Sequence, residues 1–364
     1  MVTINEIETR AFRVPLKNPW GDQTHRVTHI EIILAEIGTT AGIKGLGFSY
    51  TVGFGGLAIK SLIDNYLKHE LYAQDCEPRV LWSRLWRAAH DVGGGGVVTA
   101  SLAALDIAMW DVMAKSADKP LIEVLGRHRS SISAYGSGIN LHLSESELLE
   151  QVRRWQDAGY DGVKIKVGKP DLEEDLDRVD AVRQLVGPNV KLMLDANQGW
   201  DVTAAVKRCQ ALERFDPYWI EEPLIADDVL GHAELANRTR IPVAIGENVY
   251  TVYQYNQYLR LRACAFSQAD VVRSGGITPY LHIANLCDAW NVPMAPHFMM
   301  EITGQVLCGI RNGHILEDVE GGSFSDLGIS LSANPVDNGV FHPPSVPGHG
   351  IAFDMSVLSP LAIH

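Results

Sequence analysis

The stretch from residue 191 to residue 247 decides the fold, because it holds three short apolar segments that each end in a carboxylate: KLMLD (191–195), WIE (219–221) and VAIGE (243–247). The terminal acids Asp195, Glu221 and Glu247 are separated by two equal steps of 26 residues. A step of this length accommodates one strand, one helix and two short loops. Acids at the carboxyl ends of three successive parallel strands predict a hard metal ion in the mouth of a β/α barrel.

The segments on either side repeat the same alternation. Further strands are predicted at 132–139, 162–167, 267–272, 293–297 and 314–318, with helical patterns between them. Eight strands that alternate with helices indicate an α/β fold, a parallel sheet closed into a TIM-type (β/α) barrel.

The chain divides into three predicted parts. Residues 1–125 read as an α+β domain with three antiparallel strands before residue 50 and a long helix from about 97 to 117. Residues 126–320 form the predicted barrel. Residues 321–364 are rich in Gly, Ser and Pro, and we expect them to return to the N-terminal domain as loops and short strands.

Composition narrows the function classes. The chain has 364 residues and a formal net charge of −13, which disfavours nucleic acid and anionic membranes as partners. No apolar stretch of about 18 residues is evident, and the first residues carry no apolar signal core, so we expect a cytoplasmic protein with no membrane span. The five cysteines form no CxxC pair, which indicates free thiols and disfavours a zinc or redox site.

Two lysines mark the strand before the first acid. In Val163-Lys-Ile-Lys-Val167, Lys164 and Lys166 share one face and point into the barrel. A single lysine there would indicate a structural ion pair with a carboxylate. Two lysines beside three acids favour catalysis. We expect the charge of Lys164 and partial burial to lower the pKa of Lys166, as a general base requires.

Three residues follow at the ends of the later strands. Asp270 and His297 end the predicted sixth and seventh strands, where a carboxylate would orient the imidazole and raise its pKa. A lone histidine is more often a core residue whose hydrogen bonds are satisfied. Here Asp270 occupies the equivalent position on the adjacent strand, which favours a His297–Asp270 dyad. Glu317 ends the eighth strand, and we expect it to donate a hydrogen bond to a substrate carboxylate rather than lie on the rim.

The remaining candidates concern ligand contacts. Of the adjacent Glu221 and Glu222 only one can point inward, and the 26-residue step selects Glu221. Asn197 shares a face with Asp195 and is expected to contact metal or substrate. The breaker-rich segment 18–26 is either an ordinary surface loop or a lid over the site, and as a lid it offers Trp20, His25 and Arg26.

Three carboxylates suit Mg²⁺ better than zinc, because no Cys or His lies at the three positions. A substrate carboxylate bound to Mg²⁺ is a better electron sink, so its α-proton becomes removable and an enediolate results. Lys166 and His297 come from opposite sides of the barrel and could act as two bases, or as one base and one acid.

The motifs Lys164-x-Lys166, Asp195-x-Asn197, Trp219-Ile-Glu-Glu-Pro223, Gly246-Glu-Asn248, Asp270, His297 and Glu317 resemble the enolase superfamily and, within it, the mandelate racemase subgroup. Enolase-type sites are known to remove α-protons with a Lys or His base and Mg²⁺. The resemblance implies a modified barrel covered by an N-terminal α+β capping domain, and a homo-oligomer. It implies Mg²⁺ ligation by Asp195, Glu221 and Glu247, acid/base roles for Lys166 and the His297–Asp270 dyad, and Glu317 as hydrogen-bond donor.

This subgroup contains both racemases and acid-sugar dehydratases. The polar composition of the lid disfavours mandelate and suits a sugar acid, whose distal carboxylate could meet Arg26 or His25. We therefore expect dehydration of an aldarate or aldonate, for example one like galactarate or talarate, to a 2-keto-3-deoxy acid. Racemisation or epimerisation of a 2-hydroxy acid, cycloisomerisation of a lactone, and Mg²⁺-dependent carboxylate binding without turnover remain alternatives.

Overall fold

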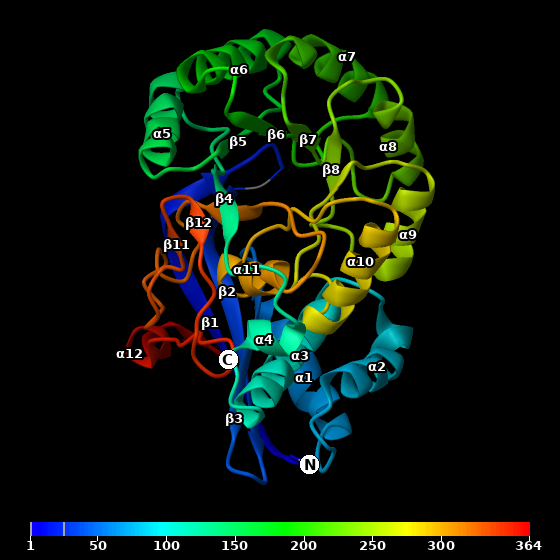
Figure 1. Cartoon of the computed structure of the whole chain (residues 1–364), viewed down its shortest axis with the longest axis vertical. Helices are drawn as coiled ribbons and strands as arrows, with labels where there is room; N and C mark the ends of the chain where they lie inside the picture. The colour runs from blue at the N-terminus through cyan, green and yellow to red at the C-terminus, as the bar shows by residue number, and fades with distance from the viewer. Residues whose placement is uncertain (1, 25) are drawn as a thin grey trace.

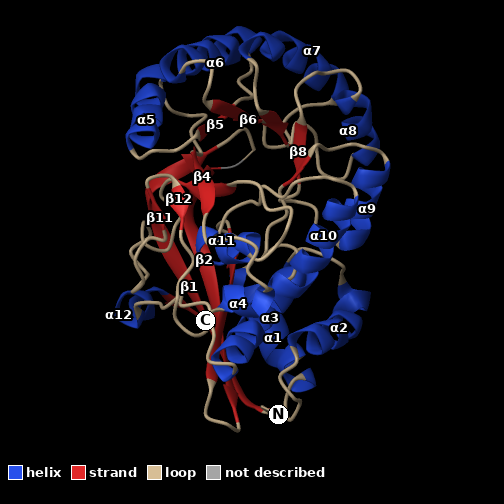
Figure 2. Ribbon diagram, in the orientation of Figure 1, coloured by secondary structure: helices blue, strands red, loops and turns tan. Residues whose placement is uncertain are grey.

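The computed structural model describes residues 2–24 and 26–364. A barrel surrounded by helices forms one end of the molecule, and an α+β unit packs against it (Figure 1). Figure 2 shows the long strands of this second unit running up to the barrel strands.

The barrel strands are parallel neighbours in chain order. They are β4 (Ile132–Ser137), β5 (Gly162–Lys166), β6 (Lys191–Asp195), β7 (Trp219–Glu221), β8 (Val243–Ile245), β9 (Phe266–Ser267) and β10 (Leu316–Val319). Each pairs with the next from β4 to β9, and β10 pairs with β4. Isolated bridges of Met294 to Ser267 and to Gly313 complete the ring between β9 and the segment that leads into β10.

The predicted seventh strand, 293–297, is shorter than expected. It is reduced to a bridge at Met294, which pairs in parallel with Ser267 and Gly313. Prolines 293 and 296 flank this residue and have no N–H to donate, so the ladder cannot extend in either direction.

Helices cover the outside of the barrel as an arc in Figure 1. The arc runs through α5 (Glu145–Asp157), α6 (Leu172–Val186), α7 (Val202–Leu212), α8 (Val229–Ala236) and α9 (Val252–Arg260). Helix α10 (Ile277–Ala289) follows α9, and the buried α11 (Met300–Cys308) is drawn inside the arc, near the centre of the view. The predicted capping box opens α5, since Ser144 and Glu147 bond to each other's backbone N–H. Side chains from several strands fill the barrel below its mouth: Tyr135, Met193, Trp219, Ala244, Ala295 and Ile315.

The capping unit begins with an antiparallel sheet of β1 (Ile4–Gly21), β2 (Arg26–Thr39) and β3 (Lys44–Thr51). Helices α1 (Gly56–Asn65), α2 (Pro78–Ala89) and α3 (Val97–Ser116) follow, and a short α4 (Leu121–Leu125) leads to the barrel. Helix α3 lies close on β3 because Gly45 and Gly47 have no side chains. A Cβ on Gly47 would lie 1.9 Å from the carbonyl oxygen of Ala104.

Helix α3 corrects one expectation from the sequence. By length and composition it is apolar enough to cross a membrane, with a mean hydropathy of 1.6, although no such stretch was expected. In the structure it is the central helix of the capping unit, and 89% of its apolar window is buried within the protein. Its hydrophobicity is therefore accounted for by packing between β3 and its neighbouring helices.

The C-terminal part crosses back over the barrel and the capping unit. Strands β11 (Val336–Asp337) and β12 (Val340–Phe341) extend the barrel sheet beside β4, and α12 (Met355–Leu358) follows. Strand β13 (Ala362–Ile363) then pairs with β1 at the edge of the capping sheet. The residue limits of the three predicted parts stay predictions.

The predicted loop at 18–26 is the end of a long hairpin. Strand β1 continues to Gly21, and Trp20 pairs with Val27 of β2 after an irregularity between Pro15 and Trp20. This bulge absorbs the extra residues that had indicated a loop, so ladder pairing continues almost to the tip. His25 lies outside the described residues.

Candidate active site

The three acids of the sequence motif meet at one point. Asp195 ends β6, Glu221 ends β7 and Glu247 follows β8 by two residues, and each offers an oxygen within 4.8 Å of the others. All three are buried. Parallel strands bring their carboxyl ends to the same rim, so the equal sequence steps become a cluster in space.

Both lysines of β5 point into this cluster. Lys164 Nζ lies 2.6 Å from Glu221 Oε1 and 2.6 Å from Glu317 Oε1. Lys166 Nζ lies 2.5 Å from Asp195 Oδ2. Val163 and Ile165, on the opposite face of β5, pack into the core between strands and helices. Strand alternation therefore places both cations among the acids.

The predicted lowering of the Lys166 pKa is wrong for the protein alone. Burial and the charge of Lys164 do lower it, but Asp195, Glu221 and Glu247 together raise the pKa of Lys166 above its usual value. The pKa of Lys164 is likewise raised, because Glu221 and Glu317 outweigh its burial. The pattern of lysines did not reveal how many carboxylates would touch them.

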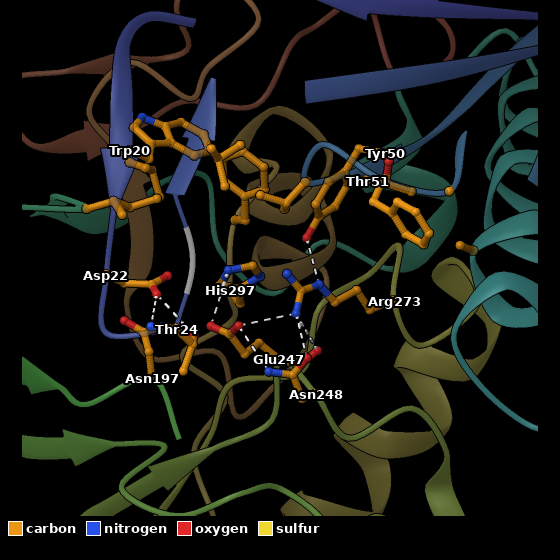
Figure 3. A pocket seen from close by; sticks show the side chains of 18 of the residues that line it. Trp20, Asp22, Thr24, Tyr50, Thr51, Asn197, Glu247, Asn248, Arg273 and His297 are labelled. Atoms are coloured by element: carbon orange, nitrogen blue, oxygen red, sulfur yellow. Dashed lines mark hydrogen bonds and ion pairs between the residues drawn. The ribbon is translucent and has the colours of Figure 1, made fainter. Parts of the chain in front are cut away.

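The histidine and aspartate of the predicted dyad are in contact. Asp270 Oδ2 lies 2.7 Å from His297 Nδ1. On the other side of the ring, His297 Nε2 lies 3.3 Å from Glu247 Oε2 (Figure 3). Burial lowers the pKa of His297, but the charge of Glu247 and the hydrogen bond to Asp270 raise it above its usual value overall. The imidazole is thus held through Nδ1, which leaves Nε2 facing the acidic cluster.

Within the protein, Glu317 is a hydrogen-bond acceptor, and its predicted donation to a substrate carboxylate stays a prediction. Its carboxylate lies beside Lys164 and accepts hydrogen bonds from the Ser137 hydroxyl at 2.7 Å and the Phe298 N–H at 3.0 Å. Burial raises the pKa of Glu317, but the positive charge of Lys164 lowers it more, to about 2. The group is therefore ionised at neutral pH.

Of the two adjacent glutamates, Glu221 is the one that points inward, as predicted. Glu221 points to Lys164, whereas Glu222 lies on the other side of the turn and accepts from the Asn248 amide at 2.8 Å. Asn197 donates its backbone N–H to Asp195, and its side-chain oxygen is buried with no hydrogen-bond partner among the described residues. This oxygen is available to a ligand.

A cavity of about 610 Å³ opens above these groups between barrel and capping unit. Trp20 lines it, as do Asp22 and Thr24 from the hairpin tip. Arg26 is exposed and is not among the described lining residues. Its neighbour Val27 lines the cavity, and alternation along β2 points Arg26 to the other face. The contact of Arg26 with substrate stays a prediction.

Two residues of the site were missed from the sequence. Tyr50, on β3 of the capping unit, donates its hydroxyl to Asp270 Oδ2 at 2.6 Å. Arg273 donates to Glu247 Oε1 at 3.2 Å, to the Asn248 side chain at 2.8 Å and to the Tyr50 hydroxyl at 3.1 Å (Figure 3). The position of Arg273 three residues after Asp270 was a usable signal. Tyr50 gave none, because its contact spans 220 residues of sequence.

Comparison with known proteins identifies the family. Residues 147–357 match the family described as enolase C-terminal domain-like, and residues 5–126 match the mandelate racemase / muconate lactonizing enzyme N-terminal domain. The chain belongs to the enolase superfamily. This confirms the family resemblance and the fold, a barrel-like α/β domain with an N-terminal capping domain.

Several of the similar proteins are named as enzymes that act on sugar acids. A 3,6-anhydro-α-L-galactonate cycloisomerase of Streptomyces coelicolor is 33% identical over 362 residues, covering 99% of both chains. An L-talarate/galactarate dehydratase of Salmonella typhimurium is 38% identical over 300 residues, or 79% of this chain and 74% of the relative. The crystal structure of an L-talarate dehydratase from Polaromonas sp. JS666, complexed with Mg and L-glucarate, has a TM-score of 0.93 at 32% identity, covering 100% of this chain and 98% of that chain.

Mg²⁺ is the cofactor of this superfamily, and the residues of this chain fit it. The three buried acids provide an all-oxygen donor set, which is the set that Mg²⁺ prefers. Asn197 adds a buried oxygen that has no partner among the described residues. The predicted cofactor is thus confirmed by magnesium-bound structural neighbours and by the chemistry of the donor set.

Proposed function

We propose that this enzyme removes the proton α to the carboxylate of a sugar acid and then eliminates the β-hydroxyl to give a 2-keto-3-deoxy acid. The observation that carries the proposal is the placement of two different bases on either side of the acidic cluster. Lys166 contacts Asp195 at one end of the cluster, and His297 contacts Glu247 at the other. A binding protein has no need of two bases in this position.

When held by Asp195, Glu221 and Glu247, Mg²⁺ stabilises the negative charge that develops on the substrate carboxylate and offsets the charges that raise the pKa of Lys166. The α C–H bond breaks as its proton passes to Lys166 Nζ or His297 Nε2, and its electrons are delocalised into the carboxylate as an enediolate. The C2–C3 double bond then forms while the C3–O bond breaks. His297 delivers a proton to the departing hydroxyl, which leaves as water, and the enol tautomerises to the 2-keto acid.

Proton NMR in D₂O with Mg²⁺ over a panel of sugar acids and 2-hydroxy acids tests the proposal. We expect one sugar acid to disappear with formation of a 2-keto-3-deoxy product, and EDTA to abolish this reaction. The variants Lys166→Ala and His297→Asn should each lose at least about 100-fold in turnover, the usual contribution of a positioned acid or base. Turnover that survives both substitutions would refute these assignments, and α-proton exchange or epimer formation without elimination would indicate a racemase or epimerase.

A second candidate is cycloisomerisation, because the relative named for that reaction spans 99% of this chain and of its own length. After the same α-proton removal, the bond from C3 to an internal ring oxygen would break, and this oxygen would take the proton from His297 and stay on the molecule as a hydroxyl in place of leaving as water. The mass of the product separates the two reactions, since dehydration loses one water and cycloisomerisation loses none. Homo-oligomerisation and cytoplasmic location stay predictions.

A further inference from the structure

The active-site cavity has two chemically different ends. Its floor consists of the barrel groups that carry the proposed chemistry. The end formed by the capping unit is mainly apolar, with side chains from the start of β2, the turn after β3, α1 and the start of α3: Val27, Val52, Ala58, Ile59, Val97 and Ala100.

Aromatic rings form the transition between the two ends. Phe298 packs edge-on against Trp20 at 6.0 Å and against Tyr50 at 5.1 Å between ring centroids. Figure 3 shows Trp20 and Tyr50 on opposite sides of the cavity, above His297 and Arg273. A substrate held by its carboxylate at the floor therefore extends between aromatic rings toward an aliphatic wall.

The cations that line the cavity all lie at the catalytic end. Each is ion-paired with a carboxylate of the site: Lys164 with Glu221 at 2.6 Å, Lys166 with Asp195 at 2.5 Å and Arg273 with Glu247 at 3.2 Å. Among the described lining residues, the capping end contains no Lys, Arg or His. A second carboxylate on the substrate would lose its hydration there without gaining a cation.

The cavity therefore favours a substrate whose distal end is uncharged over one whose distal end carries a carboxylate. Burying a carboxylate without a partner is strongly unfavourable, whereas burying a methyl or methylene group against an aliphatic wall is favourable. From this cavity we propose that the substrate is a monocarboxylic sugar acid with an uncharged, partly apolar distal end, such as a 6-deoxyaldonate, and not an aldaric diacid. This inference rests on the proposed sugar-acid chemistry and replaces the distal carboxylate expected from the sequence.

Matched series of substrates test the inference directly. Within one series the configuration from C2 to C5 is constant and only C6 changes, as in 6-deoxygalactonate, galactonate and galactarate. Corresponding gluco and manno series cover other configurations. Deuterium exchange at C2 and product formation are followed by NMR with Mg²⁺. In the series that reacts, we expect kcat/KM for the 6-deoxyaldonate to exceed that for the aldarate by at least tenfold.

A substitution on the aliphatic wall adds an independent test. Val97 is 42% exposed and lies at the start of α3, so a longer side chain can be accommodated. Val97→Arg should raise kcat/KM for the aldarate relative to the 6-deoxyaldonate by at least tenfold, and Val97→Met, of similar reach without charge, should not.

The outcomes separate this inference from the proposal on which it rests. Turnover that favours the aldarate in the natural enzyme, or equal preferences in Val97→Arg and Val97→Met, would overturn the inference and leave the sugar-acid chemistry intact. Absence of both exchange and product in every series would overturn the proposed function and this inference with it.

Discussion

The Tyr50 hydroxyl connects the capping unit to the catalytic dyad, and Tyr50→Phe tests that connection. The hydroxyl donates to Asp270 Oδ2 at 2.6 Å, the same oxygen that lies 2.7 Å from His297 Nδ1. It also accepts from Arg273 Nε at 3.1 Å. Phenylalanine keeps the ring that packs against Phe298 and removes only these hydrogen bonds.

The magnitude follows from burial and charge. Tyr50 is 3% exposed and Asp270 is 1% exposed, so water does not replace the lost donor. A hydrogen bond to a charged group contributes about 1.5–3 kcal/mol, and we expect the free energy of unfolding to fall by about this amount. Without the Tyr50 hydroxyl, Asp270 is held less firmly and orients His297 less well. If this raises the activation free energy by about 1.4 kcal/mol, reactions that use His297 slow about tenfold. Reactions that use Lys166, on the other side of the cluster, should be nearly unchanged.

The assay combines stability with stereospecific exchange. Denaturant unfolding compares Tyr50→Phe with Tyr280→Phe, because Tyr280 is also buried but its hydroxyl has no partner among the described residues. Deuterium exchange at C2 is then measured with substrates of opposite C2 configuration, which present the α-proton to Lys166 or to His297. Equal stability of the two variants, or equal slowing of exchange from both faces, would refute the reasoning.

Two further predictions concern buried charges. Lys164→Met leaves two carboxylates uncompensated, so it should lower the free energy of unfolding by about 3–5 kcal/mol at neutral pH. The control Lys60→Met removes a more exposed ion pair with Asp64 and should lower the free energy of unfolding by about 1 kcal/mol or less. Denaturant titrations that give similar losses for the two variants would contradict this prediction. Burial raises the pKa of Asp106 from its usual 3.8 to about 7. The folded protein therefore keeps a proton that the unfolded chain has released, and this contribution to stability is complete below 3.8 and disappears as the pH rises to about 7. Asp106→Asn should remove the effect, and a constant stability difference between the two proteins over this pH range would show that Asp106 does not titrate as described.

The sequence predicted the elements of the site that depend on strand position. Asp195, Glu221 and Glu247 meet because a parallel barrel aligns the carboxyl ends of its strands, and the repeat length of the chain reveals that alignment. Lys164 and Lys166 follow from the two-residue period of a strand. These features are local or periodic, so no knowledge of distant contacts was needed.

The sequence could not predict charge balance or contacts between the two units. The sign of the Lys166 pKa shift depends on three carboxylates from three other strands, and their summed effect exceeds that of the neighbouring Lys164. The low pKa of Glu317 likewise depends on its contact with Lys164 of another strand. The role of Tyr50 depends on how the capping sheet sits over the barrel, which no local pattern encodes.

The hairpin tip shows what the mean composition of a segment leaves out. The segment 18–26 is polar on average, and that average indicated a polar lid suited to a diacid. A strand, however, presents alternate residues to opposite faces, so the face toward the cavity matters more than the mean. Trp20 and its pairing partner Val27 are both buried and both line the cavity, whereas Arg26, one residue before Val27, is exposed. Asp22 and Thr24 also line the cavity, so the hairpin presents both apolar and polar side chains to it, and the mean polarity of the segment does not give the character of that face.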